Sequence, residues 1–207
     1  MTAFTTDQET FWAEEFGDDY IGRNRSEELL ASNLQFFSSA LKQAGKIKSC
    51  REFGANIGMN MKALKLLFPS VQLKGIEINE TAAKQLAETI GKENVYHGSI
   101  FEAPVTEKVE LSLIKGVLIH INPEMLQAVY QKLYDSSSKW ILIAEYYNPA
   151  PVAIPYRGHM DRLFKRDFAG EFLDKFSDTE LVDYGFAYRR DPAFPQDDIT
   201  WFLIKKK

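Results

Sequence analysis

The sequence predicts an α/β fold, in which a mostly parallel sheet of seven strands carries helices on both faces and follows an N-terminal helical segment. From residue 46 onward, short apolar segments alternate with helical patterns, as is typical of a parallel sheet with crossover helices. One of these segments, 140–144, is apolar throughout, as expected of a parallel strand buried on both faces. The 207 residues, 45% hydrophobic and 26% charged, suffice for one α/β domain with a sizeable core.

We expect one structural domain, made of an N-terminal helical segment, 1–45, and a larger part that carries the sheet, 46–207. The N-terminal segment should pack over the site. Asn24 and Glu27 have the spacing of a capping box at the start of a helix in the first segment. Asn79 and Asn122 can each cap a later helix. The first predicted strand is short, starts at Ser49 and ends at the acidic residue Glu52. The other predicted strands are 71–78, 94–97, 111–114, 140–144, 181–188 and 200–204, the last two forming an antiparallel hairpin.

A glycine turn follows the first predicted strand and reads E-x-G-x-N-x-G, from Glu52 through Gly54 and Asn56 to Gly58. Glycines at such a turn supply positive φ and let a ligand approach the backbone. A dinucleotide site would instead read G-x-G-x-x-G, with amide groups facing a pyrophosphate. A carboxylate at this place would repel phosphate, so the turn favours a ligand that carries an ammonium group.

A second acidic residue, Glu77, ends the next strand about 20 residues after the turn. In α/β nucleotide sites an acid at this place accepts hydrogen bonds from the ribose hydroxyls. The third strand leads into Gly98, Ser99 and Ile100, where many adenine sites place a polar side chain against the exocyclic amine. Ser99 could equally be a plain turn serine.

These residues resemble the motifs of class I S-adenosylmethionine-dependent methyltransferases over roughly 46–207, with Asn56 replacing the usual middle glycine and Ser99 the more usual aspartate. The resemblance implies a Rossmann-like methyltransferase fold, methyl transfer from S-adenosylmethionine, and no metal. The cofactor-binding residues that it implies are Glu52, Gly54, Asn56, Gly58, Glu77, Ile78, Ser99, Ile100 and Lys115.

Five further segments, at 11–24, 115–123, 145–149, 154–159 and 165–170, together resemble the small methylases associated with pseudaminic acid biosynthesis. That family is found among genes for surface-glycan and flagellin modification. The resemblance implies a small, anionic, sugar-derived acceptor of the nonulosonic acid type, methylated on nitrogen or oxygen.

Candidate catalytic residues follow the fourth and fifth strands: His120, Glu145 and Tyr146. A general base is needed only when the acceptor must lose a proton, and His120 could instead be a hydrogen-bonded structural histidine. An unpaired Glu145 at the end of an apolar strand would be costly, which favours a functional role for it. The candidate substrate-binding residues are Tyr20, Arg23, Asn24, Tyr147, Asn148, Tyr156 and Arg157. Arg157 suits an acidic group of the acceptor, although a surface ion pair would explain it equally well.

Composition excludes several classes of function. The net charge of −4 argues against a non-specific grip on nucleic acid. No apolar run has membrane length, and the first residues lack the pattern of a signal peptide. One cysteine suits a reducing cytoplasm, and His97, His120 and His159 lack metal-ligand spacing. The sequence therefore predicts a cytoplasmic enzyme with a small-molecule partner, and leaves its oligomeric state open.

Two alternatives remain. Asn148-Pro149-Ala150-Pro151 is similar to the N-P-P-Y motif of amino methyltransferases that act on nucleic acid bases, but it follows the fifth predicted strand rather than the fourth and lacks the terminal aromatic. The other alternative is a non-catalytic binding protein that keeps the fold, against which the intact turn and Glu77 argue.

Overall fold

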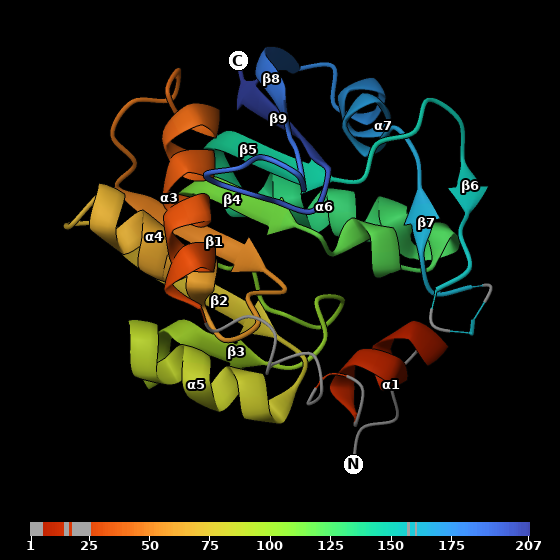
Figure 1. The fold of residues 1–207 in the computed structure, drawn as a ribbon, viewed down its shortest axis with the longest axis horizontal. Coiled ribbons are helices and arrows are strands. Elements are labelled where there is room, and N and C mark those ends of the chain that lie inside the picture. Colours follow the sequence, from red (N-terminus) through yellow and green to blue (C-terminus); the bar gives the residue numbers. More distant parts are fainter. Residues whose placement is uncertain (1–5, 15–16, 18–25, 157, 160) are drawn as a thin grey trace.

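The computed structural model describes residues 6–14, 17, 26–156, 158–159 and 161–207. It contains a seven-stranded sheet of order β3-β2-β1-β4-β5-β9-β8, in which β1 to β5 are parallel and β9 runs antiparallel to both β5 and β8 (Figure 1). The strands are β1 (Ser49–Phe53), β2 (Gln72–Glu77), β3 (Val95–His97), β4 (Val109–Lys115), β5 (Ser137–Glu145), β8 (Thr179–Ala187) and β9 (Ile199–Lys206). The predicted mostly parallel α/β fold is confirmed.

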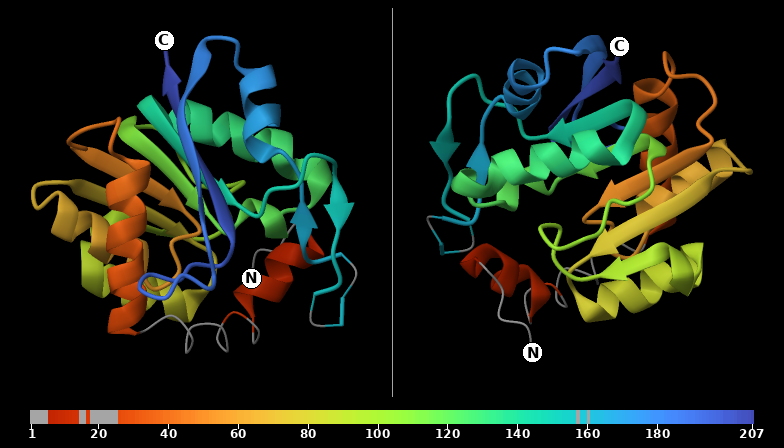
Figure 2. Two further views of the ribbon diagram at one scale, coloured as in Figure 1. Left: turned by 45° about the horizontal axis from the view of Figure 1, so that its top comes forward. Right: turned by 180° about the vertical axis from the view of Figure 1, so that it is seen from behind.

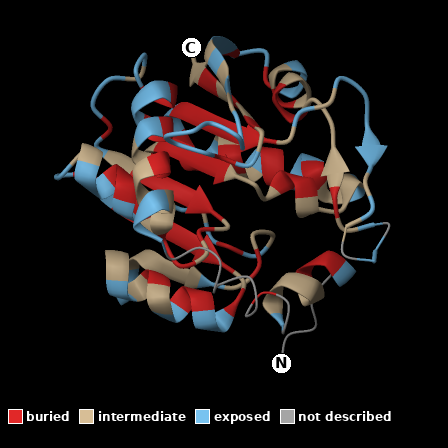
Figure 3. Ribbon diagram, viewed as in Figure 1, coloured by how far each residue is buried: buried red, intermediate tan, exposed pale blue. Residues whose placement is uncertain are grey.

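Helices cover both faces of this sheet because successive strand residues point to opposite sides. On one face, α3 (Glu27–Ala40), α4 (Met59–Leu67) and α5 (Glu80–Ile90) pack against a cluster that includes Cys50, Leu73 and Leu113. On the other face, α6 (Leu126–Ser136) and α7 (Phe168–Lys175) pack against a cluster that includes Phe53, Ile76 and Ile114. Figure 3 shows the central strands as buried and the outer surfaces of the helices as exposed.

Several boundaries differ from those that the sequence predicts. The N-cap of α3 is Ser26, whose Oγ accepts the Leu29 N–H at 3.0 Å, whereas the predicted cap Asn24 lies outside the described residues. The predicted cap Asn122 holds a short 3₁₀ turn, Pro123–Met125, which leads into α6. The helix α7 and the small hairpin of β6 (Val152–Ala153) and β7 (Phe164–Lys165) were not predicted.

The N-terminal helix α1 (Asp7–Ala13) lies beyond the carboxyl ends of β1 and β2, on the side of the molecule that also carries β6 and β7 (Figures 1 and 2). Its side chains join it to the loop between β6 and β7: Gln8 Nε2 donates to the Asp161 carbonyl at 2.9 Å, and the Phe11 ring lies 5.5 Å from that of His159. Two segments far apart in the sequence therefore meet above the same edge of the sheet.

Candidate functional site

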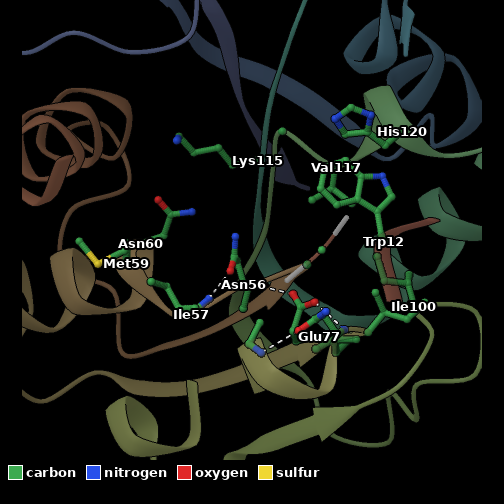
Figure 4. Close-up of a pocket in the computed structure, with 18 of the residues that line it drawn as sticks. Trp12, Asn56, Ile57, Met59, Asn60, Glu77, Ile100, Lys115, Val117 and His120 are labelled. Carbon is green, nitrogen blue, oxygen red and sulfur yellow. Dashed lines mark hydrogen bonds between the residues drawn. The ribbon is translucent and has the colours of Figure 1, made fainter. Parts of the chain in front are cut away.

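A cavity of about 430 Å³ opens at the carboxyl ends of β1, β2 and β4, where the strand order reverses between β1 and β4. In open α/β sheets this reversal creates the crevice in which ligands bind. Figure 4 shows side chains from several segments pointing into it. Its lining comes from α1, α3, the turn after β1, the loops after β2, β3 and β4, and the loop between β8 and β9.

The glycine turn forms the floor of this cavity through Gly54, Ala55 and Asn56. Gly54 has φ +77°, and a Cβ there would lie 2.5 Å from Cγ2 of Val117 in the loop after β4, so only glycine lets these two loops approach. Asn56 also adopts a left-handed conformation, with φ 48°, which asparagine tolerates better than most residues. Gly58 does not line the cavity; it starts α4 with φ +84°, packed against Leu86 of α5.

Glu77 lies at the cavity wall with its carboxylate held by backbone amides. Oε2 accepts the Asn56 N–H at 2.7 Å, and Oε1 accepts the Asn79 N–H at 2.8 Å. Burial raises the pKa of this carboxyl, while these amides and that of Ile78 oppose the rise. Glu77 and Ile78 both line the cavity, so the carboxylate that fixes the turn also faces the ligand space.

Glu52, the first acid of the turn, is fully buried and does not line the cavity. Its Oε1 accepts a hydrogen bond from Asn60 Nδ2 at 2.5 Å, and Asn60 does line the cavity. Its Oε2 has no hydrogen-bond partner within the described part of the chain. Burial raises the pKa of Glu52 to about 8, with the Asn60 hydrogen bond and the Lys115 charge acting in the opposite direction.

Lys115, at the end of β4, directs its ammonium group into the cavity 5.4 Å above the ring of Phe36 (Figure 4). Burial lowers its pKa, and attraction to Glu52, Asp197 and Glu145 counteracts this. Asp197 lines the same end of the cavity from the loop between β8 and β9. Asn33 of α3 lies there too, holding Gln196 at 3.0 Å. Sequence reasoning missed Asn33, Gln196 and Asp197, because no local pattern links a β-hairpin loop to a glycine turn.

Ser99 and Ile100 line the opposite end, next to Phe101. The Ser99 hydroxyl donates to Glu9 of α1, and its oxygen accepts the Phe101 N–H at 3.0 Å. Glu9 is a buried carboxylate that also lines the cavity. Glu9 is not among the residues that the sequence predicts for the site, because nothing in the local sequence shows that α1 reaches this strand end.

His120 lies in the cavity wall between two other aromatic rings, 4.6 Å from Trp12 and 5.3 Å from Tyr156. Its Nδ1 is 2.6 Å from the carbonyl oxygen of Arg162, which can only accept, so Nδ1 carries the proton and Nε2 has a free lone pair. Burial lowers the pKa of His120 to about 4, so the ring is neutral at pH 7.

Glu145 does not line the cavity, which removes the geometric reason for treating it as a catalytic residue. Its carboxylate accepts the N–H groups of Val117, Leu118 and Ile119 at 3.0, 2.9 and 3.4 Å. Burial raises its pKa to about 7, and these three amides limit the rise. The expected cost of an unpaired carboxylate does not arise, because the loop before His120 satisfies it.

The remaining sequence candidates lie apart from the cavity lining. Tyr146 lies 5.1 Å below the ammonium group of Lys165, Tyr147 is exposed and packs near Phe202, and the Asn148 side chain donates to Ala150 within its own turn. Tyr156 does not line the cavity, but its ring lies 5.3 Å from that of His120, which does. Tyr20, Arg23, Asn24 and Arg157 lie outside the described residues.

Two features of the described residues bear on the kind of protein and site that they form. They contain no group of three or more His, Cys, Asp or Glu side chains that could hold a metal ion. None of their helices is long and apolar enough to cross a membrane.

No protein-family model matches the chain, and no curated protein matches it in sequence. Solved structures nevertheless match along nearly its whole length. The 1,6-didemethyltoxoflavin N1-methyltransferase of Burkholderia thailandensis, solved with that compound and S-adenosylhomocysteine, is similar with a TM-score of 0.72 at 12% identity, covering 100% of this chain and 93% of the other.

A mitomycin 7-O-methyltransferase matches with a TM-score of 0.69 at 14% identity over 98% of this chain, which spans 61% of that protein's length. The magnesium protoporphyrin IX methyltransferase of Synechocystis, solved with bound S-adenosylmethionine, matches with a TM-score of 0.66 at 12% identity over 100% of both chains. The chain therefore has the Rossmann-like fold of the class I S-adenosylmethionine-dependent methyltransferases.

Proposed function

We propose that this protein is an S-adenosylmethionine-dependent methyltransferase that acts on a small-molecule acceptor. The observation that carries the proposal is the cavity at the reversal of strand order, with Glu77 on its wall and Lys115 and Asp197 at one end. A phosphate-bearing dinucleotide fits poorly there, since Glu9, Glu77 and Asp197 all contribute carboxylates to the lining.

The charges in the cavity match the groups of the proposed cofactor. Glu77 would hold the ribose hydroxyls, because its carboxylate already faces the ligand space. Lys115 would pair with the carboxylate of the amino-acid part, and Asp197 with its ammonium group. The buried Glu52 lies behind Asn60 and fixes its side chain, since Oε1 accepts the Asn60 Nδ2 hydrogen bond. Ile78, Ile100 and Phe101 offer apolar surface to the base.

When bound, the cofactor supplies an electrophilic methyl group on a sulfonium, with a good leaving group already present. The protein's task is then to align the acceptor and to exclude water, which can contribute about 7–11 kcal/mol. Trp12, Val117 and Ile121 enclose the part of the cavity beside His120 and provide such a dry wall.

His120 is the general base that the geometry favours, should the acceptor atom carry a proton. The Arg162 carbonyl fixes the tautomer and leaves Nε2 able to accept a proton. Glu145 supports this arrangement indirectly, because it holds the loop of Val117 to Ile119 that precedes the histidine.

For the acceptor we propose an anionic, sugar-derived metabolite of the nonulosonic acid type, methylated on nitrogen or oxygen. This part of the proposal rests on the sequence resemblance, with Arg157 as the candidate partner of the acid group. The nucleobase alternative has less support, because Asn148 follows β5 and does not line the cavity.

Calorimetric titration with S-adenosylmethionine and S-adenosylhomocysteine tests the cofactor, and labelled methyl transfer to a panel of sugar acids and their nucleotide derivatives tests the acceptor. Absence of cofactor binding would overturn the proposed function. With an acceptor in hand, His120→Asn should lower kcat by about 10²–10⁴-fold while cofactor affinity stays unchanged. His97→Asn serves as the matched control, because His97 is exposed and does not line the cavity. An unaltered kcat in His120→Asn would remove that residue from the chemistry.

A further inference from the structure

We infer that Glu9 of the N-terminal helix reads the exocyclic amine of the cofactor's adenine, so that α1 supplies the carboxylate that the loop after β3 lacks. This inference rests on the proposed function and names a specificity-determining residue within the same site.

The position of the base follows from the order of the strands. A ribose held by Glu77 lies at the end of β2, and β3 is the neighbour of β2 on the side away from β1. The base, which extends beyond the ribose and away from the glycine turn, therefore reaches the loop after β3. Ser99, Ile100 and Phe101 line the cavity at this place.

Ser99 is poorly suited to recognise an amine by itself. Its single hydroxyl proton is donated to Glu9, and its oxygen already accepts the Phe101 N–H. Glu9 is the negatively charged acceptor in this corner, and it lines the cavity although its residue is only 7% exposed. An amine is a donor, so it pairs with an ionised carboxylate through a charge-assisted bond, which is stronger than a bond to a neutral hydroxyl.

The fold holds Glu9 at this position from two directions. Its Oε2 accepts the Thr6 N–H at 3.0 Å and the Thr6 hydroxyl at 3.2 Å, in the capping box that starts α1. Its Oε1 accepts the Ser99 hydroxyl, which ties α1 to the end of β3 across 90 positions of sequence. The carboxylate is thus fixed before a ligand arrives, and a carbonyl in place of the amine would face its negative charge.

The experiment compares two ligands that differ at this group: S-adenosylhomocysteine, and S-inosylhomocysteine, in which a carbonyl replaces the amine. We expect the wild-type protein to prefer the adenosyl compound by about 10- to 150-fold, the range for one charge-assisted hydrogen bond. In Glu9→Gln the preference should fall to about threefold or less, since a glutamine amide can donate to the carbonyl as readily as it accepts from the amine.

Asp7→Asn is the matched control, because it removes a carboxylate from the same helix whose side chain is 87% exposed and does not line the cavity. This variant should keep the wild-type preference. The double variant Glu9→Gln/Ser99→Asp should regain it, because a carboxylate returns to the same corner, and this rescue excludes a mere loss of folding in the single variant.

The outcomes separate the two proposals. Failure of the wild-type protein to bind S-adenosylhomocysteine overturns the proposed function. Binding with an unchanged preference in Glu9→Gln overturns the role of Glu9 alone. Loss in Glu9→Gln with recovery in the double variant supports the inference.

Discussion

Glu77 and Glu145 occupy equivalent places in the sheet, yet only one of them faces the cavity. Each is the last residue of a parallel strand, each is buried, and each accepts backbone N–H groups from the loop after a neighbouring strand. Glu77 holds the turn after β1 and remains on the cavity wall, whereas Glu145 is separated from the cavity by the loop after β4 that it holds. A buried carboxylate at a strand end is therefore not by itself a sign of catalysis, because backbone amides can satisfy it completely.

The largest expected effect is on stability and comes from removing the carboxylate of Glu145, which holds the loop after β4. Glu145→Ala leaves three N–H groups of the loop at Val117–Ile119 without an acceptor, two of them buried, and should lower the free energy of unfolding by about 3–5 kcal/mol. Chemical denaturation measures this. Tyr147→Ala, two residues further on and 44% exposed, should change stability by about 0.5 kcal/mol or less. Equal losses in the two variants would contradict the supporting role of Glu145.

The second test concerns the carboxylate on the cavity wall. In the proposed binding mode, Glu77→Ala would remove two charge-assisted hydrogen bonds to the ribose, so affinity for S-adenosylhomocysteine should fall by about 3 kcal/mol, or roughly 100-fold. Glu145→Gln should change this affinity much less, as should Glu88→Ala, which alters an exposed acid of α5. Calorimetric titration of the three variants decides the comparison, and unchanged affinity in Glu77→Ala would remove that residue from the binding site.

The smallest effect concerns the pH dependence that Glu52 imposes. Its pKa is about 8 in the folded chain and near 4.5 when unfolded, so between these values the folded state binds a proton that the unfolded state lacks. The stability that Glu52 contributes to the folded state is thus fully present below about pH 4.5 and is lost as pH rises through about 8. Between pH 6 and 8 the titration of Glu52 should lower the free energy of unfolding by about 2 kcal/mol, since one pKa unit corresponds to about 1.4 kcal/mol.

Glu52→Gln cannot take up that proton, so its free energy of unfolding should fall less than that of the wild-type protein over the same interval. Denaturation curves at pH 6, 7 and 8 measure the difference. Parallel pH profiles for the two proteins would show that Glu52 does not titrate as its burial indicates.

The sequence predicts the part of the cavity lining that comes from the turn after β1 and the end of β2, but not the part that comes from more distant segments. The turn after β1 and the acid ending β2 are local features, since strand, glycines and helix adjoin one another in the chain, and the structure places Gly54, Asn56 and Glu77 around one cavity. Other predicted candidates, among them Tyr147 and Asn148, lie away from it. Position after a strand says which edge of the sheet a residue reaches, but not toward which side its side chain points.

The sequence by itself determined the fold class, because apolar periodicity and turn residues act over a few neighbouring positions and fix strands, helices and their alternation. It also determined which residue types stand at the carboxyl ends of β1 and β2. Only the tertiary structure decided that Glu9 meets Ser99, that Asp197 closes the end near Lys115, and that Glu145 is satisfied by amides. These contacts join segments that are 26 to 90 positions apart. They depend on how the layers pack against each other, which no local pattern encodes.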